Sequence, residues 1–301
     1  MANVSAARTV PPACVWMDGM IYPEDEAKIS VFDRGFLYGD SVYEVTRTFG
    51  GKPFALEEHL VRLAHSANAI GIPLPGRGLL EEAVKQAVAA GNFRDAYIRI
   101  IVTRGAGDIG LDPALADKPR LLVIARQVEG PQPEMYEQGV EVRIVSVTRN
   151  ARRAIDPAVK SGNYLNNVLA IAEAKRESAY EALMLDTDGR IAECSTSNIF
   201  FVRGERVFTP ALEIGILDGI TRQKVFEICA EQKILVEEGA YLPDELKGAD
   251  EAFLTSSVRG VLPVVRVDGK DVGKGKPGAI TRRIMKGYEA LTQAAAKGEK
   301  G

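Results

Sequence analysis

Lys160 and Glu193 stand in the two segments of this chain whose residue types are best suited to chemistry. Lys160 follows the apolar step Pro157-Ala158-Val159 and precedes a Ser-Gly-Asn turn, and Glu193 lies beside a run of small polar residues. A lysine on an apolar wall can lose part of its charge through desolvation and then act as a nucleophile. A carboxylate held apart from it can keep a proton on a ring nitrogen. These are two of the parts that a pyridoxal phosphate (PLP) site needs, although most lysines and glutamates are only solvated surface charges.

The elements that must hold these two residues are clearly marked in the sequence. Apolar residues at helical spacing predict a helix over residues 164–179, directly after the lysine turn. Its inward-facing residues are expected to be Leu165, Val168, Leu169 and Ala172. The turn Asp188-Gly189 separates short apolar runs at 182–185 and 191–194, which predicts a hairpin. Glu193 is therefore expected on a strand, which is a rigid mount for a cofactor contact.

The N-terminal half shows strands and hairpins around two helices. A hairpin is expected within residues 14–32, and a β-branched run predicts a strand over 96–103. Helical spacing predicts helices over 56–70 and 79–90. Further strands are expected at 41–49 and 121–125, and the glycine-punctuated segment 32–40 is expected to form a loop near a site.

Residues 105–110 read Gly-Ala-Gly-Asp-Ile-Gly, which matches the G-x-G-x-x-G fingerprint of dinucleotide-binding proteins. That fingerprint must open a helix, and here Leu-Asp-Pro follows, with Pro119 soon after. We therefore reject dinucleotide binding and expect a mobile loop over a site. A nicotinamide-dependent oxidoreductase would rest on this loop alone, and a spectrum separates the two cofactors because bound PLP absorbs visible light.

A domain boundary is predicted between Glu129 and Glu134, where two prolines and a glycine interrupt both periodicities. We expect a linker at 128–135 between a small N-terminal α+β domain (13–127) and a large C-terminal α+β domain (136–301) that carries Lys160. Residues 1–12 lack the pattern of a signal peptide and are expected to form a disordered arm. Further elements of the C-terminal domain are expected at 139–146, 198–202, 207–209, 252–255 and 261–267 for strands, and at 220–232 and 280–295 for helices.

Composition narrows the class of protein. The 301 residues are 46% hydrophobic and 26% charged, which suits a globular protein with one large or two medium domains. A net charge of −3 and a pI near 5.7 argue against a nucleic-acid partner, and no apolar run reaches the ~20 residues of a membrane span. Three dispersed cysteines and two histidines favour neither a disulfide framework nor a metal site. A reducing, cytoplasmic location is expected.

Two motifs resemble those of the fold-type IV PLP enzymes, a family of branched-chain amino acid aminotransferases, D-amino acid aminotransferases and aminodeoxychorismate lyases. The lysine segment reads Lys-Ser-Gly-Asn-Tyr-Leu (160–165), and the glutamate segment reads Glu-Cys-Ser-Thr-Ser-Asn-Ile-Phe (193–200). The similarity extends from about Trp16 to about Tyr288. It implies an α+β fold of two domains with PLP in the cleft between them.

The resemblance also implies a role for each matching residue. Lys160 would be the catalytic lysine that forms the Schiff base with PLP, Tyr164 would touch the ring O3′, and Glu193 would protonate the pyridine nitrogen. The remaining cofactor contacts would be Arg62, Leu217, Gly219, Ile220, Thr221, Ser256 and Ser257. The substrate pocket would be lined by Tyr38, Tyr43, Tyr97, Arg99, Val258 and Arg259. Arg62 by itself reads as a snorkelling surface arginine, and only the family match favours a phosphate contact.

The function implied is transfer of the amino group of L-leucine, L-isoleucine or L-valine to 2-oxoglutarate, in branched-chain amino acid biosynthesis, by a homodimer or larger homo-oligomer. The chain departs from the family pattern at Ile100, where proline is frequent, and at the turn Ser-Ser-Val-Arg (256–259). A D-amino acid aminotransferase is the first alternative. That group carries a histidine in the loop after the Thr-Arg-Gly turn, and residues 103–110 contain none. An aminodeoxychorismate lyase is the second alternative.

Overall fold

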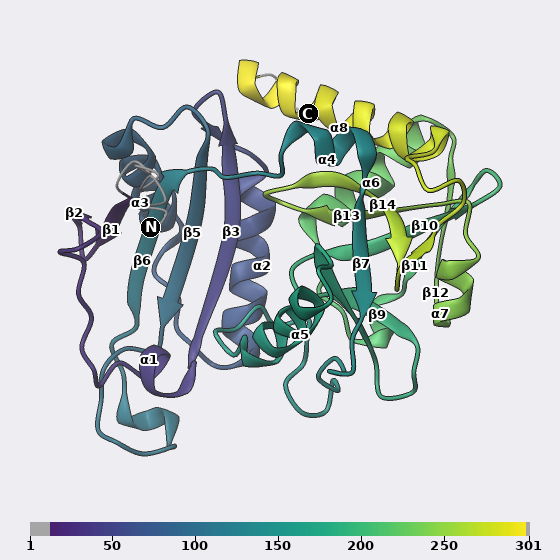
Figure 1. Ribbon diagram of the computed structural model, residues 1–301. Helices are drawn as coiled ribbons and strands as arrows, with labels where there is room; N and C mark the ends of the chain where they lie inside the picture. Colours follow the sequence, from purple (N-terminus) through teal and green to yellow (C-terminus); the bar gives the residue numbers. More distant parts are fainter. Residues whose placement is uncertain (1–12, 299–301) are drawn as a thin grey trace, which may run out of the picture.

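The computed structural model describes residues 13–298, and the arm predicted over residues 1–12 lies outside this range. The chain has an α+β fold in which two β-sheets stand side by side, each covered by its own helices (Figure 1). The first sheet has six strands and the second has nine. The mixture of hairpins and helices agrees with the predicted class and differs from a regular βαβ alternation.

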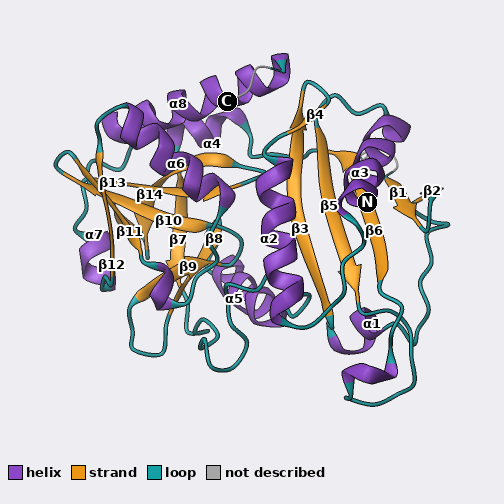
Figure 2. Ribbon diagram, turned by 180° about the vertical axis from the view of Figure 1, so that it is seen from behind, coloured by secondary structure: helices purple, strands orange, loops and turns teal. Residues whose placement is uncertain are grey.

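The six-stranded sheet is antiparallel throughout and runs in the order β2-β1-β6-β5-β3-β4. Its strands are β1 (Cys14–Met17), β2 (Met20–Pro23), β3 (Ser41–Phe49), β4 (Lys52–Pro53), β5 (Ala96–Thr103) and β6 (Arg120–Gln127). Helices α2 (Leu56–Ala69) and α3 (Arg77–Gly91) cover one face (Figure 2). Alternate residues of β5, such as Ile98 and Ile100, are fully buried in a core shared with Leu63 of α2.

The nine-stranded sheet runs in the order β12-β11-β10-β13-β14-β7-β8-β9, with β15 paired to β14. Its strands are β7 (Val140–Ile144), β8 (Glu181–Leu185), β9 (Ile191–Cys194), β10 (Asn198–Arg203), β11 (Arg206–Pro210), β12 (Leu235–Gly239), β13 (Glu251–Ser256), β14 (Gly260–Val267) and β15 (Lys270–Asp271). Apolar cores lie on both of its faces, and one contains Phe201 and Leu254 while the other contains Phe200 and Phe253.

Within residues 13–298, five helices lie around the second sheet, and one of them, α8, also reaches the first. They are α4 (Pro133–Gln138), α5 (Leu165–Arg176), α6 (Ile220–Glu231), α7 (Pro243–Lys247) and α8 (Ala279–Lys297). In Figure 1 the long α8 lies above the second sheet, and one of its ends reaches the top of β3. Its Tyr288 contacts Phe54, which follows β4, with the two ring centroids 5.9 Å apart. This contact joins the ends of the two sheets within one apolar cluster.

Two local expectations are wrong, and one segment expected to be irregular ends in a helix. The segment 32–40 contains a short helix, α1 (Arg34–Tyr38), because the Asp33 side chain accepts from the Gly35 N–H and caps its first turn. The predicted linker ends in α4, which begins at Pro133, a residue preorganised for a first helical turn. The division of the chain into domains at 128–135 stays a prediction.

The second error concerns the face of α5. The buried residues are Asn167, Ala170 and Ala174, whereas Leu165 is 70% exposed. Val168, Leu169 and Ala172 are exposed as well. Small side chains let the helix approach Ala182 and Met184 of β8 closely, so the alanine face is the one that packs.

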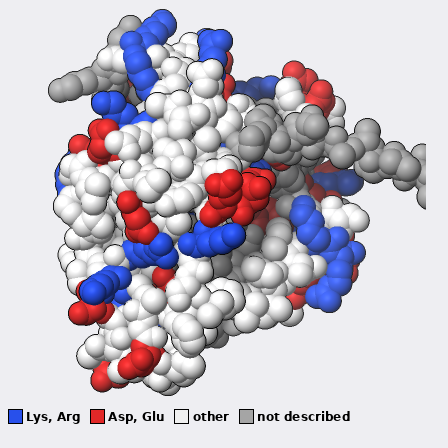
Figure 3. Space-filling model, turned by 90° about the vertical axis from the view of Figure 1, so that its left-hand side faces the viewer, with Lys and Arg blue, Asp and Glu red and all other residues white. Residues whose placement is uncertain are grey.

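The surface shows no gathering of one sign of charge on the face in Figure 3, where basic and acidic side chains are interspersed with uncharged surface. None of the helices within residues 13–298 combines the length and the hydropathy that crossing a membrane would require.

Candidate active site

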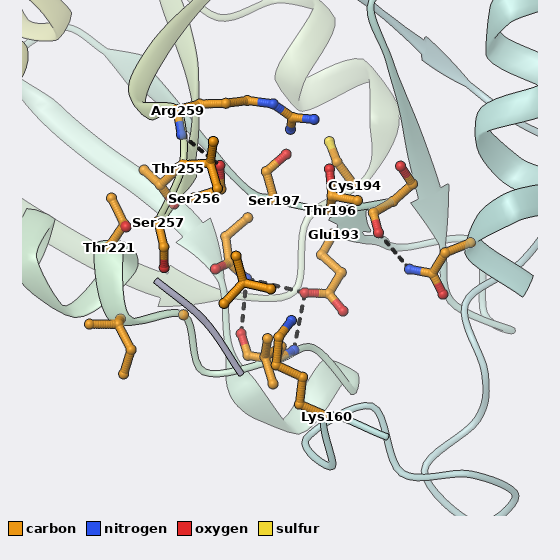
Figure 4. Close-up of a pocket in the computed structure, with 18 of the residues that line it drawn as sticks. Lys160, Glu193, Cys194, Thr196, Ser197, Thr221, Thr255, Ser256, Ser257 and Arg259 are labelled. Carbon is orange, nitrogen blue, oxygen red and sulfur yellow. Dashed lines mark hydrogen bonds between the residues drawn. The ribbon is translucent and has the colours of Figure 1, made fainter. Parts of the chain in front are cut away.

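A cavity of about 550 Å³ opens between the two sheets and brings most of the predicted residues together (Figure 4). The six-stranded sheet contributes side chains from β3 and β5, and the nine-stranded side contributes the lysine segment, β9 and the turn after β13. The predicted residues that line it are Tyr43, Arg62, Tyr97, Arg99, Lys160, Tyr164, Glu193, Leu217, Gly219, Ile220, Thr221, Ser256, Ser257, Val258 and Arg259.

Lys160 is fixed by its backbone to the first sheet. Its carbonyl accepts from the Tyr43 N–H (3.0 Å), and its own N–H donates to Ser66 Oγ of α2 (3.1 Å). The turn that follows approaches β3 so closely that a side chain at Gly162 would overlap Ser41 Oγ. A glycine is therefore required there, and the turn carries the lysine from the second half of the chain to the edge of β3.

The Lys160 ammonium reaches into the cavity among aromatic rings. Its Nζ donates to Tyr164 Oη (3.3 Å) and lies 4.7 Å from the centroid of the Tyr43 ring. Within residues 13–298 no carboxylate forms a salt bridge with this nitrogen. Burial raises the pKa of the Tyr164 phenol, but the Lys160 charge and the hydrogen bonds with Tyr43 and Lys160 together hold that pKa below its usual value. An amine without a carboxylate partner is available for nucleophilic chemistry.

Glu193 lies on β9, as predicted, and is 5% exposed. One oxygen, Oε1, accepts from Arg149 Nε (2.8 Å). The other, Oε2, accepts from the Leu217 N–H (3.1 Å) and from Asn198 Nδ2 (3.2 Å). Burial is the largest effect and raises the pKa of this carboxyl, while Arg149, the Leu217 N–H and Lys160 act in the opposite direction. Figure 4 shows Glu193 and Lys160 reaching into the same cavity.

An anion cradle stands at the N-terminus of α6. The cap residue Gly219 makes no side-chain bond, so the first N–H groups, of Ile220 and Thr221, have no partner within the helix. A Cβ at Gly219 would overlap Asn198 Oδ1, which makes glycine necessary. Arg62 reaches this end of α6 and donates from Nη1 to the Asp218 carbonyl (2.7 Å). A helix N-terminus beside an arginine is a ready phosphate site.

Sequence reasoning missed the residues behind this cradle. Glu44 is fully buried on β3 and accepts from Arg62 Nε (2.7 Å) and Nη2 (2.8 Å). His59, one turn before Arg62 on α2, is buried against the same carboxylate. A signal for Glu44 existed, because it shares the inward register of Val42 and Thr46, and a buried carboxylate requires partners. Arg149 lies in an irregular segment that carries no such signal.

Two arginines differ in their pairing on the side of the cavity that is predicted to bind the substrate. Arg99 lies 4.1 Å above the Tyr43 ring, and in the part of the chain that the structure describes no carboxylate forms a salt bridge with it. Arg259 Nη1 is instead paired with the fully buried Glu181 Oε2 (2.8 Å), which also accepts from Thr196 Oγ1 (2.7 Å). The guanidinium of Arg259 therefore already has a carboxylate partner within the protein.

Tyr38 does not line this cavity. It ends α1, where its hydroxyl accepts from the Gly110 N–H (3.3 Å) and its ring lies 5.0 Å from the Arg34 guanidinium carbon. The predicted linker does contribute to the wall, since residues 129–132 line the cavity.

The sequence matches the model of the amino-transferase class IV family over residues 41–267, which is more than half of the chain. The chain belongs to this family. A branched-chain-amino-acid aminotransferase of Pseudomonas aeruginosa is 34% identical over 281 residues, covering 91% of each chain. A D-alanine aminotransferase of Bacillus licheniformis is also 34% identical, over 272 residues that cover 90% of this chain and 94% of the relative.

Solved structures agree with the fold of this class IV aminotransferase. The branched-chain amino acid aminotransferase of Escherichia coli superimposes with a TM-score of 0.89 at 31% identity, covering 93% of this chain and 94% of the other. The branched-chain enzyme of T.th., solved with pyridoxamine 5'-phosphate, gives 0.89 at 32% identity, covering 97% and 96%. The cofactor of the present chain is pyridoxal 5'-phosphate.

The cavity fits this cofactor. The uncapped start of α6 and Arg62 can take a phosphate, while Lys160 and Glu193 can serve the aldehyde and the ring nitrogen. Two hydroxyls of the wall, Ser197 Oγ and Thr255 Oγ1, are buried and have no hydrogen-bond partner among residues 13–298, as expected where a polar group completes the site.

Proposed function

We propose that this aminotransferase moves the amino group of L-leucine, L-isoleucine or L-valine to 2-oxoglutarate. The observation that carries the proposal is Arg99, a guanidinium without a carboxylate partner among the described residues, set among Tyr43, Tyr97 and Val258. Aromatic and aliphatic walls favour a branched apolar side chain. The guanidinium can pair bidentately with the second carboxylate of 2-oxoglutarate.

Pyridoxal phosphate supplies a conjugated ring that accepts the electron pair released at the substrate Cα. Lys160 would hold the cofactor through Nζ. When free, Nζ would act as the general base and general acid that moves a proton at the substrate Cα. Tyr164, whose hydroxyl accepts from Nζ, would bind the ring O3′.

The remaining cofactor contacts hold the ring in place. Glu193 would keep the ring nitrogen protonated, because its carboxylate, held by Arg149 and the Leu217 N–H, stabilises a positive charge beside it. Arg62, the N–H groups of Ile220 and Thr221, and Ser257 hold the phosphate. Leu217, Gly219 and Ser256 complete the wall around them.

A pocket with both an apolar wall and a cation must accept two kinds of side chain in turn. The branched-chain enzyme of T.th. has been solved with 4-methylvaleric acid and, separately, with N-(5'-phosphopyridoxyl)-L-glutamate. These two compounds supply a branched apolar chain and an acidic chain. In this chain, Arg99 is the candidate for the acidic one, since Arg259 is held by Glu181.

The first alternative is a D-amino acid aminotransferase, which the identity to a D-alanine aminotransferase favours as strongly as the identity to the Pseudomonas aeruginosa relative. The absence of a histidine from residues 103–110 argues against it. The chain has two histidines, of which His59 is buried behind the phosphate cradle and His65 is exposed on α2. An aminodeoxychorismate lyase of Bacillus subtilis, 31% identical over 262 residues, represents the second alternative.

We further propose that the protein works in the cytoplasm, in branched-chain amino acid biosynthesis, as a homodimer or larger homo-oligomer. Exposed apolar side chains on α5 and after β5 support association, among them Leu165, Ile109 and Leu111. The three free cysteines fit a reducing compartment.

A donor panel with both enantiomers of each amino acid tests the proposed reaction. We expect L-leucine, L-isoleucine and L-valine to react fastest with 2-oxoglutarate. Faster reaction of D-alanine or D-glutamate would replace the branched-chain hypothesis with the first alternative. Release of pyruvate from aminodeoxychorismate without amino transfer would point to the lyase.

A further inference from the structure

His59 connects a buried carboxylate to the phosphate cradle. Its ring is 1% exposed and lies between Glu44 of β3 and the turn after β13. The Nδ1 atom is 2.7 Å from Glu44 Oε2, and the Nε2 atom is 3.3 Å from Ser257 Oγ. Ser257 lines the cavity beside the start of α6. The His59 imidazole therefore connects Glu44, the carboxylate that holds Arg62, to the Ser257 hydroxyl in the proposed phosphate site.

The hydrogen bonds fix where the protons are when no phosphate is present. The Arg62 and His59 contacts hold the pKa of Glu44 well below its usual value in spite of burial, so Glu44 is an anion that can only accept. Nδ1 must then carry a proton. Burial lowers the pKa of His59, which makes the ring neutral and leaves Nε2 as an acceptor. The Ser257 hydroxyl accordingly donates its proton to Nε2 and turns only lone pairs toward the cavity.

A bound phosphate dianion changes this arrangement. Phosphate oxygens accept hydrogen bonds, and the Ser257 hydroxyl has one proton to give. If that proton turns to the phosphate, the lone pair of Nε2 faces the lone pairs of Ser257 Oγ. A second proton on the ring resolves the conflict, because Nε2–H can then donate to Oγ while Oγ donates to the phosphate.

The local charges favour the same change. The charged groups that act on His59 are Glu44 on β3, Arg62 on α2 and Lys160 on the segment before α5. Glu44 and Arg62 carry opposite charges and are paired with each other. A phosphate dianion brings two further negative charges toward the ring, and nearby negative charge favours the protonated imidazole.

We propose that His59 is a positioning residue that takes up one proton from solvent when the cofactor phosphate binds, and thereby turns the Ser257 hydroxyl into a phosphate donor. This inference rests on the proposed cofactor site. By linkage, the phosphate must then bind more tightly to the protonated form. The pKa of His59 is higher in the complex, so affinity is greatest below the pKa of the free protein. It falls by about tenfold per pH unit until the pKa of the complex is passed.

The first test observes the ring directly. The chain contains only two histidines, so ¹⁵N-histidine labelling gives two imidazole spectra, and His65→Asn assigns them. In the full-length protein freed of cofactor, we expect His59 to be neutral with its proton on Nδ1. Adding sulfate, a dianion that does not itself titrate near neutral pH, or restoring pyridoxal phosphate, should protonate Nε2. A ring that stays neutral with either anion bound would overturn the proposal.

The second test counts the protons. Sulfate binding measured by calorimetry in two buffers of different ionisation enthalpy should show uptake approaching one proton in the wild type at pH 7.5. The uptake should persist in His65→Asn and vanish in His59→Asn, whose amide can still donate to Glu44 but cannot titrate. Uptake that is unchanged in His59→Asn would refute the assignment, and the wild-type spectra decide the question if that variant does not fold.

The spectra also separate this inference from the proposed function. If restored pyridoxal phosphate gives no visible absorbance from a Schiff base, the cofactor site itself is wrong. If the absorbance returns while His59 remains neutral, only the inference about His59 fails.

Discussion

Replacing Arg99 by alanine should separate the two substrates of the proposed reaction. The guanidinium is half-buried over the Tyr43 ring and has no carboxylate partner among residues 13–298, so its pairing with 2-oxoglutarate costs no existing ion pair. A hydrogen bond to a charged group contributes about 1.5–3 kcal/mol. Loss of the pair should therefore lower kcat/KM for 2-oxoglutarate by roughly 10- to 150-fold.

The same variant should lose much less activity with an apolar oxo acid as the acceptor. With 4-methyl-2-oxopentanoate no second carboxylate is left unpaired, and we expect kcat/KM to change by less than about threefold, in line with lost packing alone. Arg99→Lys keeps the charge without the planar fork and should lie between wild type and alanine for 2-oxoglutarate. Arg206→Ala, at an exposed position on β11, controls for the change in net charge.

The assay is steady-state kinetics with L-leucine and each oxo acid as acceptor, followed by the spectrum of the bound cofactor. The decisive quantity is the ratio of kcat/KM for the two acceptors. An equal loss with both acceptors would refute the reasoning, because it would show that Arg99 supports the cavity or the cofactor and does not recognise the second carboxylate.

Three further predictions concern the cofactor residues. Borohydride treatment and peptide mapping should place the pyridoxyl group on Lys160, and a label on Lys224 or any other lysine would defeat the assignment. Glu193→Gln should still bind PLP while turnover falls by roughly two or more orders of magnitude, and near-normal turnover would show that another group serves the ring nitrogen. Glu44→Gln leaves the Arg62 charge buried without its carboxylate partner. It should lower the free energy of unfolding by about 3–5 kcal/mol in denaturant titrations at pH 7. Because the folded pKa of Glu44 is lowered, its contribution is present above about pH 4.3 and lost as the pH falls, so wild type and variant should converge in acid; a gap that persists there would contradict the ion-pair account.

Much of the local structure follows from residue patterns. The strand predicted over 41–49 is β3, residue for residue, and the strand predicted over 96–103 is β5. The predicted helix 56–70 differs from α2 by one residue. Apolar residues recur every two positions in a half-buried strand and about every 3.6 positions in a helix, and glycine turns interrupt both patterns. These patterns are local in the sequence, so the elements can be predicted without knowledge of the tertiary structure.

The orientation of α5 could not be predicted in this way. Hydrophobicity alone favours burying Leu165 and Leu169, and the helix buries Ala170 and Ala174. Which face packs depends on the space left above β8, and that space is a property of the assembled sheet.

The sequence by itself was enough to predict the chemistry of the site. The lysine segment, the strand that carries Glu193 and the glycine before α6 are local motifs. Each of them is defined by only a few adjacent residues. The tertiary structure decided how the site is supported. Glu44 joins His59, 15 residues away, to Arg62, and His59 in turn meets Ser257, 198 residues away. The tertiary structure also pairs Arg259 with Glu181 and leaves Arg99 facing the cavity. Such pairings depend on which strands become neighbours, since a buried charge finds its partner across the packed sheets and not along the chain.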